Sequence, residues 1–204
     1  MHILPLHCKL DEVEKHVKPA EKVVHVGIGD STVELLWSLK QHRELTLIDK
    51  DEVKLSYIAG FVKKYFPNIE LYSKVSPRKP RATLNGSIKI LTRLRSSLNL
   101  PPLPRGYVTG KVTVLLMDIL KPVDCSLFPC ESYNFAFAFG FTEILHERED
   151  MLPVFIDNLR KLLKKGGKAV LSDIIPKGIV RDIIENSRIF RGEGKYTYIL
   201  HRTY

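Results

Sequence analysis

Residues 22–40 read KVVHVGIGDSTVELLWSLK, and this stretch decides the fold. Val23–Gly27 suits a short buried strand, and two glycines spaced by one residue allow a tight turn after it. Asp30 or Ser31 can cap the helix that follows, whose apolar residues recur at helical spacing (Val33, Leu36 and Trp37). The order of strand, glycine turn and helix predicts a βαβ unit that holds a nucleoside cofactor against the helix N-terminus.

The alternation of strands and helices continues on both sides of one central interruption. Strands are predicted at 44–48, 112–119, 133–140, 168–175 and 195–204, and helices at 10–17, 32–40, 51–66, 150–165 and 177–186. Because helices separate most of the strands, the expected fold class is α/β, with a doubly wound and mostly parallel sheet.

A chain of 204 residues is long enough for one domain with a full core. We expect a single domain over 1–204, with a leader over 1–20. No apolar run approaches the ~20 residues that a membrane span needs. The leader is too charged for a signal peptide, so a cytoplasmic protein without membrane contact is expected.

The cysteines favour neither a disulfide framework nor a zinc site. They are three in number, and no CxxC pair occurs (Cys8, Cys125 and Cys130). Cys125 and Cys130 are close enough in sequence to pair, but we interpret them as buried free thiols. No spacing typical of metal ligands is present, so no metal is expected.

Positive charge is concentrated in one segment of the chain. Between Glu70 and Asp118 there is no acidic residue, whereas nine basic residues lie there, as many as the net charge of +9. We interpret 72–110 as a basic insertion that contains one amphipathic helix near 87–98, with an apolar face of Ile88, Leu91, Leu94 and Leu98.

This basic segment suggests RNA or another polyanion as a partner. The candidate contacts are its exposed basic residues: Arg78, Lys79, Arg81, Lys89 and Arg93. A solvated basic loop without a partner is the alternative, and a homo-oligomer contact is also compatible with the sequence.

Asp49 is the second candidate residue of the cofactor site. It ends the second predicted strand, 20 residues after Gly29. A carboxylate there can accept hydrogen bonds from two ribose hydroxyls, as it would for NAD or for S-adenosylmethionine.

The order of the remaining motifs resembles the class I S-adenosylmethionine-dependent methyltransferase family, which has a Rossmann-like fold. VVHVGIGDS resembles the first motif of the family, LIDKDE the acidic second motif, and LLMDILKP the strand beside the adenine. YNFAFAFGFTEILHERED is similar to the fourth strand and its loop, and LPVFIDNLRKLLKKGGKAVLSDII to the helix, glycine pair and fifth strand. The C-terminal β segment is similar to the closing antiparallel hairpin, and the resemblance covers 20–70 and 111–204.

The resemblance implies that the cofactor is S-adenosylmethionine and assigns its contacts. Residues at the first motif would line the methionine part, and residues at three strand ends would hold the ribose, the adenine and the region of the sulfonium. In chain order, these contacts are His25, Gly27, Ile28, Gly29 and Asp30 at the turn, Asp49 and Lys50 at the ribose, Asp118 and Ile119 at the adenine, and Phe139 and Gly140 near the sulfonium.

Methyl transfer to an acceptor depends mainly on placement, sometimes with a general base. Glu143 and His146 are the candidate bases, because a helix would place them on one face. A solvated charged loop is the alternative interpretation of these two residues.

Several functions remain open at this level. The first is a methyltransferase acting on RNA or another nucleic acid, and the second is a methyltransferase acting on a small molecule. The third is a non-catalytic binding module, because His25 and Ser31 replace an acidic residue and a glycine that the family usually has. A nicotinamide-dependent oxidoreductase fits the first half of the chain, but not the glycine pair or the C-terminal hairpin.

Overall fold

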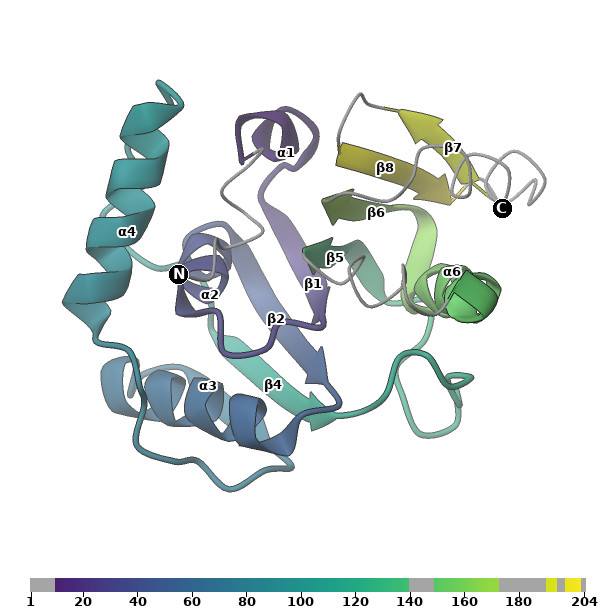
Figure 1. Cartoon of the computed structure of the whole chain (residues 1–204), viewed down its shortest axis with the longest axis horizontal. Coiled ribbons are helices and arrows are strands. Elements are labelled where there is room, and N and C mark those ends of the chain that lie inside the picture. The colour runs from purple at the N-terminus through teal and green to yellow at the C-terminus, as the bar shows by residue number, and fades with distance from the viewer. Residues whose placement is uncertain (1–9, 140–148, 173–189, 194–196, 203–204) are drawn as a thin grey trace.

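The computed structural model describes residues 10–139, 149–172, 190–193 and 197–202, which contain an eight-stranded sheet with helices on both faces (Figure 1). The strands are β1 (Ala20–Val26), β2 (His42–Asp49), β3 (Glu70–Ser73), β4 (Lys111–Leu116), β5 (Tyr133–Phe139), β6 (Leu163–Ser172), β7 (Phe190–Glu193) and β8 (Thr197–Arg202). The helices are α1 (Leu10–His16), α2 (Thr32–Leu39), α3 (Glu52–Tyr65), α4 (Leu84–Ser97) and α6 (Leu152–Leu162), which a short 3₁₀ turn precedes (Glu149–Met151).

The sheet has the strand order β3-β4-β2-β1-β5-β6-β8-β7. The six strands from β3 to β6 are parallel, whereas β8 runs antiparallel to both β6 and β7. β1 lies between β2 and β5, so the chain winds outward from β1 in both directions. In such a sheet, the crevice for a ligand opens at the carboxyl ends of the two central strands.

Neighbouring residues of each strand enter different cores because successive side chains point to opposite faces of a sheet. Val23 and Phe137 belong to the first core, with α1, α2, α3 and α4, whereas Val24 and Ala138 belong to the second, with α6. Trp37 is fully buried in the first core. This two-sided burial explains why the central strands read as continuous apolar runs.

The helix of the 72–110 segment packs on α2. Leu91 and Leu94 of α4 are 3% exposed and join the first core. One member of the predicted apolar face is wrong, because Ile88 is 37% exposed. Arg95, which is not part of that face, is buried.

Arg95 is buried because Glu14 of α1 lies opposite it. Both guanidinium nitrogens of Arg95 donate to the Glu14 carboxylate, and the Trp37 indole donates to the same group at 2.9 Å. Arg95 Nε also donates to the carbonyl of Pro101 at 2.7 Å. This network joins α1, α2 and α4 and fixes the docking of the 72–110 segment.

The chain after β3 crosses α3 at Gly60. The Arg78 amide donates to the Ser56 carbonyl at 2.9 Å, and a Cβ placed at Gly60 would lie 1.6 Å from the Arg78 carbonyl oxygen. Only a glycine allows this approach, so the segment passes over α3 on its way to α4.

Two strands were not predicted, and several element boundaries differ from the prediction, among them the end of α6. β3 and β7 were not expected, because each has only four residues and a weak apolar pattern. α6 ends at Leu162, and Leu163 already has extended dihedral angles, so β6 begins before Lys168. The predicted helix at 177–186 lies outside the described residues.

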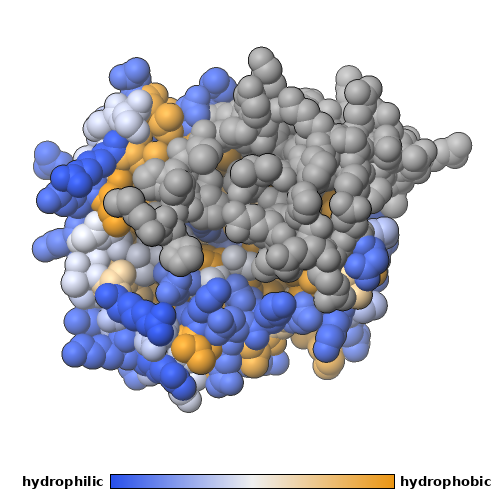
Figure 2. All heavy atoms as spheres, viewed as in Figure 1, coloured by the Kyte–Doolittle hydropathy of each residue, from blue (hydrophilic) through white to orange (hydrophobic). Residues whose placement is uncertain are grey.

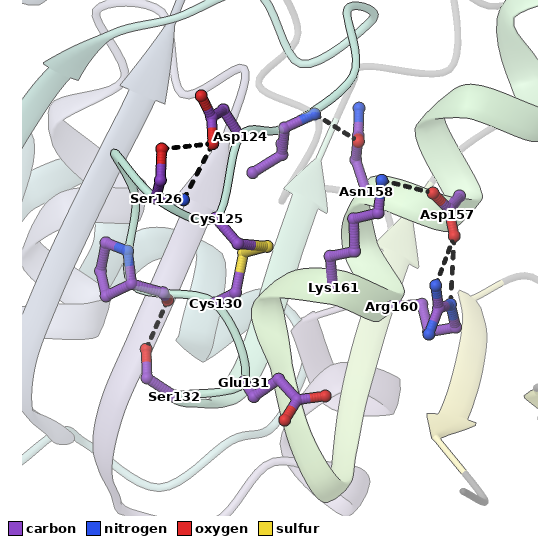
Figure 3. Close-up of a disulfide and its surroundings, with 12 residues drawn as sticks. Asp124, Cys125, Ser126, Cys130, Glu131, Ser132, Asp157, Asn158, Arg160 and Lys161 are labelled. Carbon is purple, nitrogen blue, oxygen red and sulfur yellow. Dashed lines mark hydrogen bonds and ion pairs between the residues drawn. A yellow bond between two sulfur atoms is a disulfide. The ribbon is translucent and has the colours of Figure 1, made fainter.

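Cys125 and Cys130 form a disulfide, so the prediction of two free thiols is wrong (Figure 3). A turn at Asp124 brings the cysteines together, because the Asp124 carboxylate accepts hydrogen bonds from the Ser126 amide at 2.9 Å and hydroxyl at 2.7 Å. This turn depends on side-chain bonds that hydrophobic periodicity does not reveal.

Candidate functional site

The turn between β1 and α2 requires its two glycines. Gly27 has φ of 69° and Gly29 has φ of 59°, a region that other residues rarely adopt. The Gly27 amide donates to the Ile48 carbonyl at 2.8 Å, which ties the turn to the end of β2. The backbone at this turn is therefore open to close approach by a ligand.

The carboxylate of Asp49 supports the turn from the neighbouring strand. Its Oδ2 accepts from the Gly29 amide at 2.8 Å, and its Oδ1 accepts from the Asp51 amide at 2.9 Å. The side chain is only half-buried, and each carboxylate oxygen has a second acceptor position. Asp49 can therefore bind two further donors while it holds the turn.

Asp118 lies beyond the end of β4, the strand next to β2. Its Oδ1 accepts from the Leu120 amide at 3.1 Å, and its carbonyl accepts from the Lys121 amide at 3.0 Å. Ile119 is 3% exposed and belongs to the second core. The Met117 amide donates to the Asp49 carbonyl at 2.9 Å, so a backbone hydrogen bond connects the two segments that carry the candidate carboxylates.

The start of α2 has polar groups that can face a ligand. Ser31 is the N-cap, and its buried hydroxyl has no hydrogen-bond partner of good geometry among the described residues. Burial raises the pKa of Glu34, in the first turn, to about 8. Glu34 is thus mostly protonated at neutral pH and leaves the positive end of the helix dipole uncompensated, which favours a negative group there.

The side chains of His25 and Phe139 point into the first core. His25 is 1% exposed, and its Nε2 is 2.6 Å from the Ser38 hydroxyl. Burial lowers the pKa of His25 to about 3, so the ring is neutral. The Phe139 ring lies 6.0 Å from it. These positions favour a packing role for His25 over the predicted cofactor contact. For Phe139, only the backbone can face a ligand at the end of the strand.

Solved methyltransferase structures share this architecture. N-methyltransferase NodS from Bradyrhizobium japonicum WM9 matches with a TM-score of 0.53 and 11% identity, over 97% of this chain and 94% of that one. A TehB-like S-adenosylmethionine-dependent methyltransferase from Corynebacterium glutamicum matches with a TM-score of 0.54 and 13% identity, over 98% and 88%. A methyltransferase from Pyrococcus furiosus matches with a TM-score of 0.54 and 12% identity, over 98% of this chain and 83% of that one. The chain has the class I methyltransferase fold.

At these identities the likeness shows the fold alone. No protein-family model matches the sequence, and a search of curated proteins finds no significant match. Within the class I methyltransferase fold, the strand before Gly27, the strand that ends at Asp49 and the strand before Asp118 are adjacent in the sheet.

Part of the 72–110 segment reaches the turn at 27–31, the candidate cofactor turn. The Arg81 guanidinium lies 4.0 Å above the Tyr57 ring, donates to the Tyr57 hydroxyl at 3.1 Å and is 3.8 Å from the Asp30 carboxylate. A small cavity of about 200 Å³ lies between these residues and Thr32. Nothing in the sequence indicates that Tyr57 pairs with Arg81.

The five predicted polyanion contacts are all exposed, but they fall into two groups. Arg78 and Lys79 precede Arg81 near the cofactor turn, whereas Lys89 and Arg93 lie on the outer side of α4. Figure 2 shows a largely hydrophilic surface over the described residues of one face, with scattered hydrophobic patches. Of the five, Arg81 contacts the turn through Asp30, and the start of α4 also meets the start of α2, because the Ser87 hydroxyl lies 2.7 Å from the Thr32 hydroxyl.

A cavity of about 510 Å³ lies on another part of the sheet, between β2, β4 and 122–129. The charged residues that line it are of both signs: Lys22, Glu44, Lys74, Lys111 and Asp124. Lys111 is also 3.6 Å from Glu70.

Three predicted site residues, Gly140, Glu143 and His146, lie outside the described residues. Within the part of the chain that the structure describes, no group of three or more histidine, cysteine, aspartate or glutamate residues could hold a metal ion. The described helices also include none that is long and apolar enough to cross a bilayer.

Proposed function

We propose that the protein is an S-adenosylmethionine-dependent methyltransferase. The observation that supports this most is the position of Asp49, which holds the Gly29 amide and keeps acceptor positions open at the end of β2. The residues also fit the cofactor chemically, since the start of α2 suits a carboxylate. Asp118 has a carboxylate oxygen beyond the one that Leu120 uses.

The cofactor supplies a methyl group on a positively charged sulfonium, which an acceptor attacks in line. The chain would contribute orientation: Asp49 would accept from the ribose hydroxyls, and Asp118, followed by the buried Ile119, would accept from the exocyclic amine of the adenine. Gly27 and Gly29 let the methionine part approach the backbone. Correct placement of the reacting groups is the main source of rate acceleration in such a displacement.

We expect replacement of Asp49 by alanine to abolish measurable cofactor binding. Calorimetric titration should give binding of S-adenosylmethionine and S-adenosylhomocysteine, but not NAD, to the unchanged protein. Loss of two charge-assisted hydrogen bonds of about 1.5–3 kcal/mol each would weaken affinity about 100-fold or more. Asp51→Ala is the matched control, because it removes the α3 N-cap but leaves the Asp49 carboxylate in place. Equal binding by Asp49→Ala and the unchanged protein would contradict the assignment.

We propose that the methyl acceptor is RNA, bound by Arg78, Lys79 and Arg81. The Arg81–Asp30 contact supports this proposal, because it brings the end of the basic stretch to the cofactor turn. A phosphate backbone held there would lie beside the methyl donor.

Alanine at Arg78, Lys79 and Arg81 together should weaken binding to single-stranded RNA and flatten its salt dependence. Each lost phosphate contact lowers the slope of log K against log salt by about 0.7 on single strands, so three contacts lower it by about 2. Fluorescence anisotropy over a salt series measures this slope. A control variant removes three exposed charges elsewhere (Arg43, Lys63 and Lys64). If both triple variants lose the same affinity, or if the unchanged protein binds no RNA, the acceptor proposal fails.

A further inference from the structure

A single buried amide fastens the loop that leads away from Asp118. Asn158 of α6 is 0% exposed. Its Nδ2 donates to the carbonyls of Ile119 at 2.6 Å and Lys121 at 2.8 Å, and its Oδ1 accepts from the Val123 amide at 2.9 Å. In Figure 3 the side chain points from the helix toward this loop. All three hydrogen bonds of Asn158 thus go to the backbone of one short segment.

These hydrogen bonds are important because the loop has no helix or strand whose own backbone hydrogen bonds would stabilise it. Residues 117–132, all of them described, contain turns but no helix or strand. Three backbone groups of the loop would therefore lose their partner without the amide, and unpaired buried polar groups are costly. Asn158 is the side chain that gives 119–123 its shape.

The same segment includes the predicted contacts to the adenine. Asp118 caps the turn through the Leu120 amide, and Ile119, which follows it directly, is the first residue that Asn158 binds. Met117 on the other side is bound to the Asp49 carbonyl. The orientation of the Asp118 carboxylate is thus set from one side by β2 and from the other by Asn158.

We propose that Asn158 is a positioning residue for the adenine end of the cofactor. It touches no ligand itself and acts by holding the Asp118 carboxylate where the exocyclic amine can donate to it. This inference rests on the proposed cofactor, and it adds a residue that lies in α6, outside the strand-end motifs. Interactions at the disulfide and at the end of α6 hold 124–132, whereas Asn158 binds 119–123.

The test uses ligand selectivity, which a loss of stability alone does not change. S-Inosylhomocysteine has an oxygen in place of the exocyclic amine of S-adenosylhomocysteine. We expect the unchanged protein to prefer S-adenosylhomocysteine in calorimetric titrations well below the unfolding temperature. Asn158→Leu, which removes the polar groups and keeps most of the volume, should lower that affinity about tenfold and reduce the preference, as expected for the loss of one oriented hydrogen bond.

Leu159→Ala is the matched control. Leu159 is the next residue of α6 and equally buried, but it has no polar group to bind the loop. It should destabilise the protein and leave the preference for the amine unchanged. If Asn158→Leu retains both the affinity and the preference, or if Leu159→Ala loses the preference as well, the inference is overturned.

A second measurement serves if Asn158→Leu does not fold. In the unchanged protein, hydrogen exchange of the Leu120, Lys121 and Val123 amides should slow when S-adenosylhomocysteine is added. Unchanged exchange there, despite binding, would overturn the role of Asn158 and leave the proposed function intact. Absence of any binding by the unchanged protein would overturn both.

Discussion

Replacement of Glu14 by alanine should lower the free energy of unfolding by about 3–5 kcal/mol, the usual cost of removing one partner of a buried ion pair. The Arg95 side chain is 6% exposed and the Glu14 side chain 17%. Without Glu14, the Arg95 guanidinium keeps only the Pro101 carbonyl, and the Trp37 indole loses its acceptor. The remaining positive charge would be buried without compensation. Urea unfolding followed by circular dichroism measures the change.

A surface pair and a double replacement provide the controls. Glu21 and Arg43 are each 75% exposed and 3.9 Å apart, so Glu21→Ala should change stability little. Replacing Glu14 and Arg95 together by methionine should cost less than Glu14→Ala, because no unpaired charge remains. A cost for Glu14→Ala no larger than that for Glu21→Ala would show that the network does not hold the 72–110 segment.

The stability of the protein should pass through a maximum near pH 6.5. Burial lowers the pKa of His25 to about 3 and that of His42 to about 4, from 6.5. Below pH 6.5 the unfolded chain therefore binds more protons at these rings than the folded chain does, and the stability of the protein decreases as the pH is lowered. Glu34 acts in the opposite sense, because burial raises its pKa from 4.5 to about 8. Above pH 4.5 the folded chain holds its proton more tightly, so stability falls as pH rises toward 8.

The histidine and Glu34 effects on stability cancel at the pH where the two histidines of the unfolded chain together bind about one proton. This proton offsets the one that Glu34 holds only in the folded chain. Each bound proton that differs between the states changes stability by about 1.4 kcal/mol per pH unit. Between pH 6.5 and 8, the unchanged protein should lose about 2 kcal/mol through Glu34. Glu34→Gln should abolish this alkaline loss and leave the acid side steeper. Chemical unfolding at a series of pH values tests this, and an alkaline loss retained by Glu34→Gln would contradict it.

Local patterns predicted the glycine turn and the strand that ends at Asp49. The positive φ angles of Gly27 and Gly29 follow from a turn that must pass from a strand directly into a helix. The hydrogen bond between Asp49 and Gly29 follows from the adjacency of β1 and β2 in a parallel sheet. These features depend on short stretches of chain whose periodicity is strong, and sequence reasoning is effective there.

Polar residues in the core were harder to place. His25 sits in a motif where the resemblance implies a ligand contact, yet Ser38 and the neighbouring aromatic rings enclose it. Arg95 lies at a position that helical spacing marks as half-exposed, yet its partner Glu14 is 81 residues away. The pattern of one helix does not show which element will cover it.

The sequence by itself determined the α/β class, the winding from β1 toward both edges, the glycine turn and the carboxylate at the end of β2. Periodicity and turn chemistry act over a few residues, so they can be read directly. Only the tertiary structure decided that Arg95 is internal, that Arg78 crosses Gly60, that the two cysteines pair and that Asn158 holds the loop after Asp118. Apart from the disulfide, whose turn rests on local side-chain bonds, these contacts join residues distant in sequence, and each depends on how whole helices and loops pack against the sheet.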